Sequence, residues 1–119
     1  MPYADDVLNL ARLEEAYEDD RSAIASLLGL ACETELRYIK SLREAIAADD
    51  LNGVAKAAHS IKGSASNIGA TQLSQVAADI EDRARQQRWD QIAEFADELE
   101  RRYIVMRARV GEYAASIDV

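Results

Sequence analysis

Hydrophobic residues recur along the chain at steps of three and four, which is the spacing of one face of an α-helix. The clearest run follows Asp90, which we expect to open the last helix. Its apolar positions are Ile92, Phe95, Leu99, Tyr103, Met106, Val110, Tyr113 and Ile117. An earlier run follows Asp19 and Asp20, which can cap a helix. Its apolar positions are Ile24, Leu27, Leu28, Ala31, Ile39, Leu42 and Ile46. Both runs predict long amphipathic helices that bury one face.

Two further helices lie between these runs, and a short leader precedes them. Asp49 and Asp50 offer a stop and a fresh N-cap, and the next pattern extends from about residue 51 to residue 68 before Gly69. Thr71 is the expected N-cap of the following helix, whose apolar face is Leu73, Val76, Ala77, Ile80 and Ala84. The leader runs from about residue 7 to residue 17, with Leu10 and Leu13 as its apolar anchors.

Short connections between long helices make consecutive helices antiparallel neighbours. The sequence therefore predicts an all-α fold, an antiparallel up-down-up-down four-helix bundle with a short N-terminal leader helix. Residues 1–119 are the right length for a single domain. On this interpretation the methionine and the aromatic residues of the last run belong to the core.

Composition and charge exclude several classes of function. The chain carries a formal charge of −8, which argues against a nucleic-acid partner because phosphate contacts need clustered Lys and Arg. The longest apolar run, residues 24–32, is too short to span a bilayer, and the N-terminus has no signal-peptide pattern. Cys32 is the only cysteine and we expect it in the core, so no internal disulfide forms. We expect a cytoplasmic monomer without a membrane partner.

The only histidine, His59, lies within the third pattern, in the stretch AAHSIKGSASNIGA. A loop residue, a core histidine and a reactive site are all conceivable at such a position. At about 100° per residue, the apolar residues of this helix fall roughly between 180° and 260° from the histidine. They are Val54, Ala58, Ile61, Ala65 and Ile68. The imidazole is therefore expected to project into solvent from the middle of a helix, which disfavours the loop and core alternatives.

The neighbours of His59 on the exposed side are small or cationic. Gly63, at i+4, stands where a side chain would crowd the ring, although glycine inside a helix costs about 0.5–1 kcal/mol relative to alanine. Lys62, at i+3, brings a cation within reach of a group bound to the imidazole. The other residues expected on the histidine side, as a partner-binding surface, are Ala55, Lys56 and Ser66.

These features describe a nucleophile that awaits an anionic group on a bulky partner, and phosphoryl is the natural group. A neutral imidazole attacks through its lone pair and needs no general base. The chain shows no Gly-rich nucleotide loop and no Mg²⁺ carboxylate cluster at a motif spacing, and one histidine and one cysteine make no zinc site. We therefore expect a phosphocarrier that is not itself an enzyme, binds no metal or cofactor intrinsically and relies on its partner for the chemistry.

The residues from Ala58 to Ala65 read AHSIKGSA, and they continue through Asn67-Ile68-Gly69-Ala70 to Leu73. This stretch closely resembles the signature of histidine phosphotransfer (HPt) domains, and the helical layout resembles that family over essentially the whole chain. Dimerisation helices of sensor kinases are less similar, since they usually carry an acid after the histidine and a proline a few residues later. Here Ser60 follows the histidine, and Pro2 is the only proline.

The resemblance implies a phosphorelay intermediate. His59 would accept a phosphoryl group from a response-regulator receiver domain or a histidine kinase and pass it to another receiver, with Mg²⁺ supplied through the receiver. Lys62 would give electrostatic support and Gly63 would give access. Family members also tend to place Glu or Gln on the following helix beside the imidazole, and Glu81 matches that position as an orienter of the ring. An ordinary solvated glutamate is the other interpretation of Glu81.

Two alternatives to a phosphocarrier stay open at this stage. The chain could be an HPt-shaped interaction module that docks receivers or kinases without being phosphorylated. It could also be a generic helical adaptor in which the motif arises by chance. The His-Lys-Gly set disfavours the first alternative, because a module that only binds has no need of the histidine.

Overall fold

The computed structural model describes residues 7–117, which contain five labelled helices and no strand. The helices are α2 (Leu10–Ala16), α3 (Arg21–Ala47), α4 (Leu51–Asn67), α5 (Thr71–Arg85) and α6 (Ile92–Ser116). The predicted all-α class is therefore confirmed, and the leader contains a helix of two turns. Residues 1–6 and 118–119, which include Pro2, lie outside the described part of the chain.

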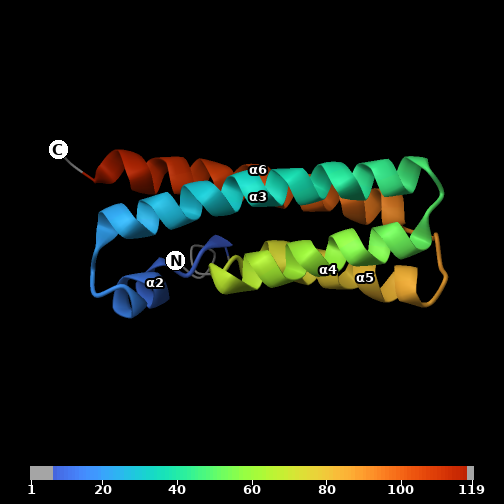
Figure 1. Cartoon of the computed structure of the whole chain (residues 1–119), viewed down its shortest axis with the longest axis horizontal. Helices are drawn as coiled ribbons and strands as arrows, with labels where there is room; N and C mark the ends of the chain where they lie inside the picture. Colours follow the sequence, from blue (N-terminus) through green and yellow to red (C-terminus); the bar gives the residue numbers. More distant parts are fainter. Residues whose placement is uncertain (1–6, 118–119) are drawn as a thin grey trace.

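The four long helices form two layers, with α3 beside α6 and α4 beside α5 (Figure 1). Each helix packs against the next in sequence, and α6 packs back against α3 to close the ring. The helices run along a body that extends 48 × 25 × 20 Å. Within residues 7–117, the helices lack the combination of length and apolar character that a bilayer crossing requires.

Two of the predicted helix caps are confirmed. The Asp20 carboxylate accepts a hydrogen bond from the backbone N–H of Ala23 at 3.1 Å, and the Asp50 carboxylate accepts one from Gly53 at 3.0 Å. Each bond satisfies one of the backbone donors that a helix start leaves unpaired. Gly69 follows the end of α4 with φ +70°, and an added Cβ there would lie 2.6 Å from the Cβ of Asn9.

Two other helices begin differently from the prediction. The N-cap of α5 is Ala70, and Thr71 is already the first helical residue. The reason is the tight turn after α4, in which the Ala70 N–H donates to the Ala65 carbonyl while the Ala70 carbonyl accepts from Ser74.

Helix α6 begins at Ile92 after Gln91, which has φ +68°, and Asp90 does not cap it. The Asp90 carboxylate instead pairs with Arg88, with a shortest distance of 2.6 Å. The Asp90 carboxylate, which the sequence pattern placed at the helix start, therefore binds the Arg88 guanidinium instead.

The predicted apolar faces form the core. The five positions assigned to the buried face of α4 are each at most 2% exposed, and Cys32 is buried as expected. Most of the apolar positions predicted for α3 and α6 are also buried, while Leu27, Ile46, Phe95 and Ile117 are partly buried against the core. The three-and-four periodicity therefore selected the correct faces of these helices.

Ala55 is buried at 6% exposure, so its predicted place on an exposed partner-binding surface is wrong. Helix α4 packs against both α3 and α5, and a helix with two neighbours buries a wider arc than a single apolar stripe suggests. Ala57, on the other edge of that arc, is buried as well.

Glu35 on α3 is completely buried, and the sequence pattern gave no sign of it. Neither carboxyl oxygen has a hydrogen-bond partner within residues 7–117. Burial raises the pKa of Glu35 to about 7, although the nearby Ser64 hydroxyl on α4 acts in the opposite direction. A carboxyl group in such surroundings favours its neutral form, because the charged form loses its hydration.

This burial predicts that the stability of the protein depends on pH through Glu35. The folded pKa lies above the ordinary value of 4.5, so the unfavourable ionisation sets in as the pH rises from about 4.5 to about 7. Glu35→Gln removes the charge, and we expect it to stabilise the protein more at pH 8 than at pH 4.5, by up to about 3 kcal/mol. Urea unfolding at the two pH values measures the difference.

Glu33→Gln is the matched control, since Glu33 lies on the same helix and is exposed. Its effect should be nearly the same at both pH values. Equal effects of Glu35→Gln at pH 4.5 and pH 8 would contradict the assignment of a buried, mainly protonated carboxyl group.

Candidate functional site

The His59 side chain is 63% exposed and projects from the middle of α4, as its helical position predicted. Helix α4 holds it there because the opposite face is anchored in the core by Val54, Ala58 and Ile61. One of the two ring nitrogens, Nδ1, lies 3.1 Å from Oε2 of Glu81 on α5. The imidazole is therefore accessible to a large partner and yet fixed at one end.

The Glu81 side chain is only 7% exposed and is surrounded by cationic donors. Lys62 on α4 approaches Oε1 at 2.7 Å, while Arg85, one turn further along α5, approaches Oε2 at 2.6 Å. Burial would raise the pKa of Glu81, but the hydrogen bonds and charges of Lys62 and Arg85 outweigh it and lower the pKa to about 2. Glu81 is thus an ionised carboxylate at neutral pH, and the alternative of an ordinary solvated glutamate does not fit.

The ionised carboxylate determines which tautomer the imidazole adopts. A carboxylate only accepts hydrogen bonds, so the contact at 3.1 Å requires Nδ1 to carry the proton and to donate. In the neutral ring the lone pair then resides on Nε2, the nitrogen that has no contact to Glu81. The site therefore presents one nucleophilic nitrogen atom to solvent.

Gly63 leaves the space beside the ring open. It is exposed, and a Cβ placed on it would meet no atom within 4 Å outside its own helix backbone. Internal packing therefore does not require glycine here, although this residue weakens the helix. What the missing side chain provides is clearance on the surface next to the imidazole.

Lys56, Ser66 and Ala55 are the other residues of α4 that the sequence placed on the histidine side. Lys56 and Ser66 are exposed on α4, whereas Ala55 is buried. The Ser66 hydroxyl lies 2.9 Å from the hydroxyl of Ser74 on α5, and Ser74 donates to the Lys62 carbonyl at 3.2 Å. Ser66 therefore links α4 to α5, one turn beyond Lys62.

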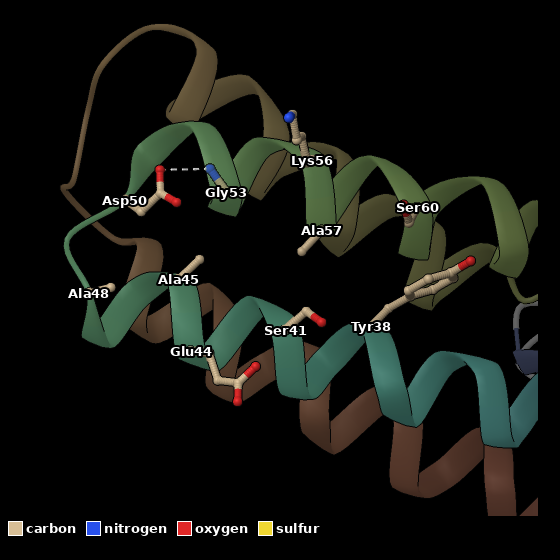
Figure 2. A pocket seen from close by; sticks show the side chains of 10 residues that line it. All are labelled: Tyr38, Ser41, Glu44, Ala45, Ala48, Asp50, Gly53, Lys56, Ala57 and Ser60. Atoms are coloured by element: carbon tan, nitrogen blue, oxygen red, sulfur yellow. Dashed lines mark hydrogen bonds between the residues drawn. The ribbon is translucent and has the colours of Figure 1, made fainter.

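A groove of about 530 Å³ lies between α3 and α4. Figure 2 shows Tyr38 and Ala45 of α3 pointing toward α4, and Ala57 of α4 pointing back toward α3. Ser41, Glu44, Lys56 and Ser60 also line the groove. Ser60 directly follows His59 in the chain, but consecutive helix residues point about 100° apart, and His59 does not line the groove.

Arg85 is the residue of the site that the sequence did not single out. Its position at i+4 from Glu81 is the typical spacing of a helical ion pair, but many such pairs occur on ordinary helix surfaces. The structure gives it a role because its partner is buried. Within residues 7–117, no three His, Cys, Asp or Glu side chains gather as a metal site would require.

Comparison with known proteins identifies relatives of this arrangement. Residues 26–104 match the family model of the Hpt domain. The crystal structure of histidine-containing phosphotransfer protein B (HptB) from Pseudomonas aeruginosa PAO1 superposes with a TM-score of 0.84 at 27% sequence identity, over 92% of each chain. The HPT domain of an Hpt sensor hybrid histidine kinase from Shewanella gives a TM-score of 0.78 at 12% identity, covering 97% of this chain and 99% of that one. No curated protein matches the sequence significantly.

The geometry predicts that Glu81 selects the tautomer of His59. In ¹⁵N NMR spectra of the neutral imidazole, the protonated nitrogen should be Nδ1, whereas free histidine favours a proton on Nε2. In Glu81→Ala, the preference for Nδ1–H should be lost because the acceptor is gone.

Asp82→Asn provides the matched control, since Asp82 is the next residue on α5 and is exposed. It should leave the tautomer unchanged. A wild-type ring that carries its proton on Nε2 would show that the contact with Glu81 does not orient the imidazole in solution.

Proposed function

Because the chain belongs to the Hpt domain family, we propose that it is a phosphorelay intermediate that carries a phosphoryl group on Nε2 of His59. The observation that carries this proposal is the combination of an exposed Nε2, an Nδ1 held by an ionised Glu81 and open space over Gly63. We propose response-regulator receiver domains and a histidine kinase as the partners. A cytoplasmic, monomeric protein remains our expectation.

In the proposed step, the Nε2 lone pair attacks the phosphorus of a receiver's aspartyl phosphate. A P–N bond forms, the P–O bond to the aspartyl oxygen breaks, and the electron pair leaves with the receiver's carboxylate. The proton on Nδ1 stays in its hydrogen bond to Glu81, so the positive charge that develops on the ring faces a carboxylate. Mg²⁺ would come with the receiver, and the reverse reaction would pass the group on.

Lys62 supports this step from beside the ring. In the structure its ammonium forms an ion pair with Glu81. The Lys62 side chain is 37% exposed and flexible enough to turn toward a phosphoryl oxygen. Arg85 stays on Glu81 when Lys62 turns away, so the buried carboxylate keeps one cation. The exposed Lys56, three residues before His59 on α4, supplies part of the docking surface.

The test is transfer from a phosphorylated receiver in the presence of Mg²⁺. The wild-type chain should acquire a phosphoryl group that is labile in acid and stable in alkali, as a phosphohistidine is. His59→Gln should acquire none and keep its helical circular dichroism, because the ring is exposed. If the wild type stays unlabelled by a broad panel of receivers that it nevertheless binds, the chain is an interaction module and not a carrier.

Bulk at Gly63 should slow the transfer without harming the fold. In Gly63→Leu the new side chain enters open space next to the ring, so we expect transfer at least tenfold slower and a helix stabilised by about 0.5–1 kcal/mol. Stopped-flow transfer rates and urea unfolding measure the two effects.

Ala93→Leu adds similar bulk at an exposed position of α6, a helix that contributes none of the residues around the imidazole, and should not change the rate. A Gly63→Leu protein that transfers as fast as the wild type would remove access as the reason for the glycine.

A further inference from the structure

A second groove, of about 510 Å³, lies between α3 and α6. None of its lining residues comes from α4 or α5, the helices that carry His59 and Glu81. Figure 1 shows α3 and α6 together as one layer of the bundle, with α4 and α5 as the other. The groove therefore belongs to a part of the surface that the histidine site does not use.

Two large apolar side chains in this groove are exposed, so they are not needed in the core. Leu36 on α3 is 50% exposed and Ile104 on α6 is 62% exposed, and both line it. Tyr103, which also lines the groove, is buried and donates a hydrogen bond to the Cys32 carbonyl at 2.8 Å. Large apolar side chains that share one exposed hollow are typical of an interaction site.

The rim of the groove is cationic, although the chain as a whole has a charge of −8. Lys40, Arg43 and Arg107 line it, together with one carboxylate, Glu100. Arg43 pairs with Asp97 and Glu100, whereas Lys40 and Arg107 form no ion pair within residues 7–117. Two uncompensated cations beside an apolar floor are complementary to a ligand that combines apolar groups with carboxylates.

Two glycines outside the groove lie on the same helix faces as Leu36 and Ile104. Gly29 lies seven residues before Leu36, and Gly111 seven residues after Ile104, so each shares a helix face with the apolar residue. A Cβ on either glycine would meet no atom within 4 Å outside its own helix backbone. Internal packing therefore does not explain a residue that weakens each helix, whereas close approach of another backbone would.

The pairing of the two helices keeps these glycines in one region. Arg21 donates to the Ser116 hydroxyl at 3.1 Å at one end, and Tyr103 contacts Cys32 nearer the middle. Gly29 and Gly111 both fall in the segments between these two contacts. The two glycines therefore lie on the same side of this helix pair, next to the groove that Leu36 and Ile104 line.

We propose that this groove between α3 and α6 binds an amphipathic helix of a partner protein that carries carboxylates beside its apolar face. A helix laid in a groove buries apolar residues at the i, i+3, i+4 and i+7 positions, and its backbone approaches closely where the receiving surface has glycine. A second copy of this chain is a poorer occupant, because two such faces would bring Lys40 and Arg107 of both copies together.

The test uses a labelled 18-residue helical probe peptide with Leu and Ala along one face and Glu on both flanks, and a counterpart with Lys in place of Glu. Fluorescence anisotropy should show that the full chain binds the Glu peptide at least tenfold more tightly than the Lys peptide. Amide NMR shifts should change along α3 and α6. The assay involves no phosphoryl transfer, so its result is independent of the proposed carrier function.

Variants test separately the cations of the groove and the glycine beside it. The double variant Lys40→Glu with Arg107→Glu should reverse the preference between the two peptides. Gly111→Leu should weaken binding of the Glu peptide at least tenfold and retain the fold, since its side chain enters open space. Glu112→Leu is the control, because Glu112 is exposed and points about 100° away from Gly111 around α6, and it should change the binding much less.

Other results would overturn the proposal. They are equal binding of the two peptides, absence of binding at millimolar concentration, and shifts centred on α4. Sedimentation that reveals a dimer which Gly111→Leu dissociates would assign the groove to a second copy of the chain instead.

Discussion

The burial of an ionised carboxylate at Glu81 is the constraint on which the site depends. A charged group with 7% of its side chain exposed is tolerated only when cations and hydrogen-bond donors compensate for the hydration it has lost. Lys62 and His59 come from α4, and Arg85 comes from α5. The need to place these groups around one carboxylate fixes how the two helices align, and the same alignment fixes the ring.

This arrangement gives the two ring nitrogens of His59 different surroundings. One nitrogen is tied to the protein through a donor contact at 3.1 Å, and the other is left to solvent. Because Arg85 also holds the carboxylate, Lys62 can leave it without exposing an unpaired buried charge. The proposed carrier would receive and release a dianionic group, and a cation that is available in either state would help it to do so. The redundancy of cations around Glu81 thus has a physical use.

The sequence predicted the fold well because the helix faces depend on apolar periodicity, which is local. Asp20 and Asp50 were found as caps for the same reason. The errors arose where a side chain had a choice of partner or where tertiary packing decided. Asp90 pairs with Arg88, and Thr71 lost the cap position to a turn that begins one residue earlier. No pattern within a single helix reports such competition.

In the candidate site, too, features that depend on one helix could be predicted, and features that depend on the packing of two helices could not. The direction of His59 and the clearance at Gly63 follow from positions along one helix, so they could be predicted. The part played by Arg85 and the burial of Ala55 depend on the approach of a second helix, and they could not. Glu35 is the extreme case, since a glutamate amid charged neighbours gives no local sign that both its oxygens are buried.

The glycines inside the helices differ in whether the packing of the fold explains them. Gly53 is explained within the fold, because an added Cβ would lie 2.5 Å from the Asp50 carboxylate that caps α4. Gly63 has no such neighbour and lies beside an exposed nucleophile. Gly29 and Gly111 are equally open and lie on α3 and α6. When internal packing does not require a glycine in mid-helix, the reason for it lies outside the fold, and a surface that must be approached closely is the physical form that reason takes.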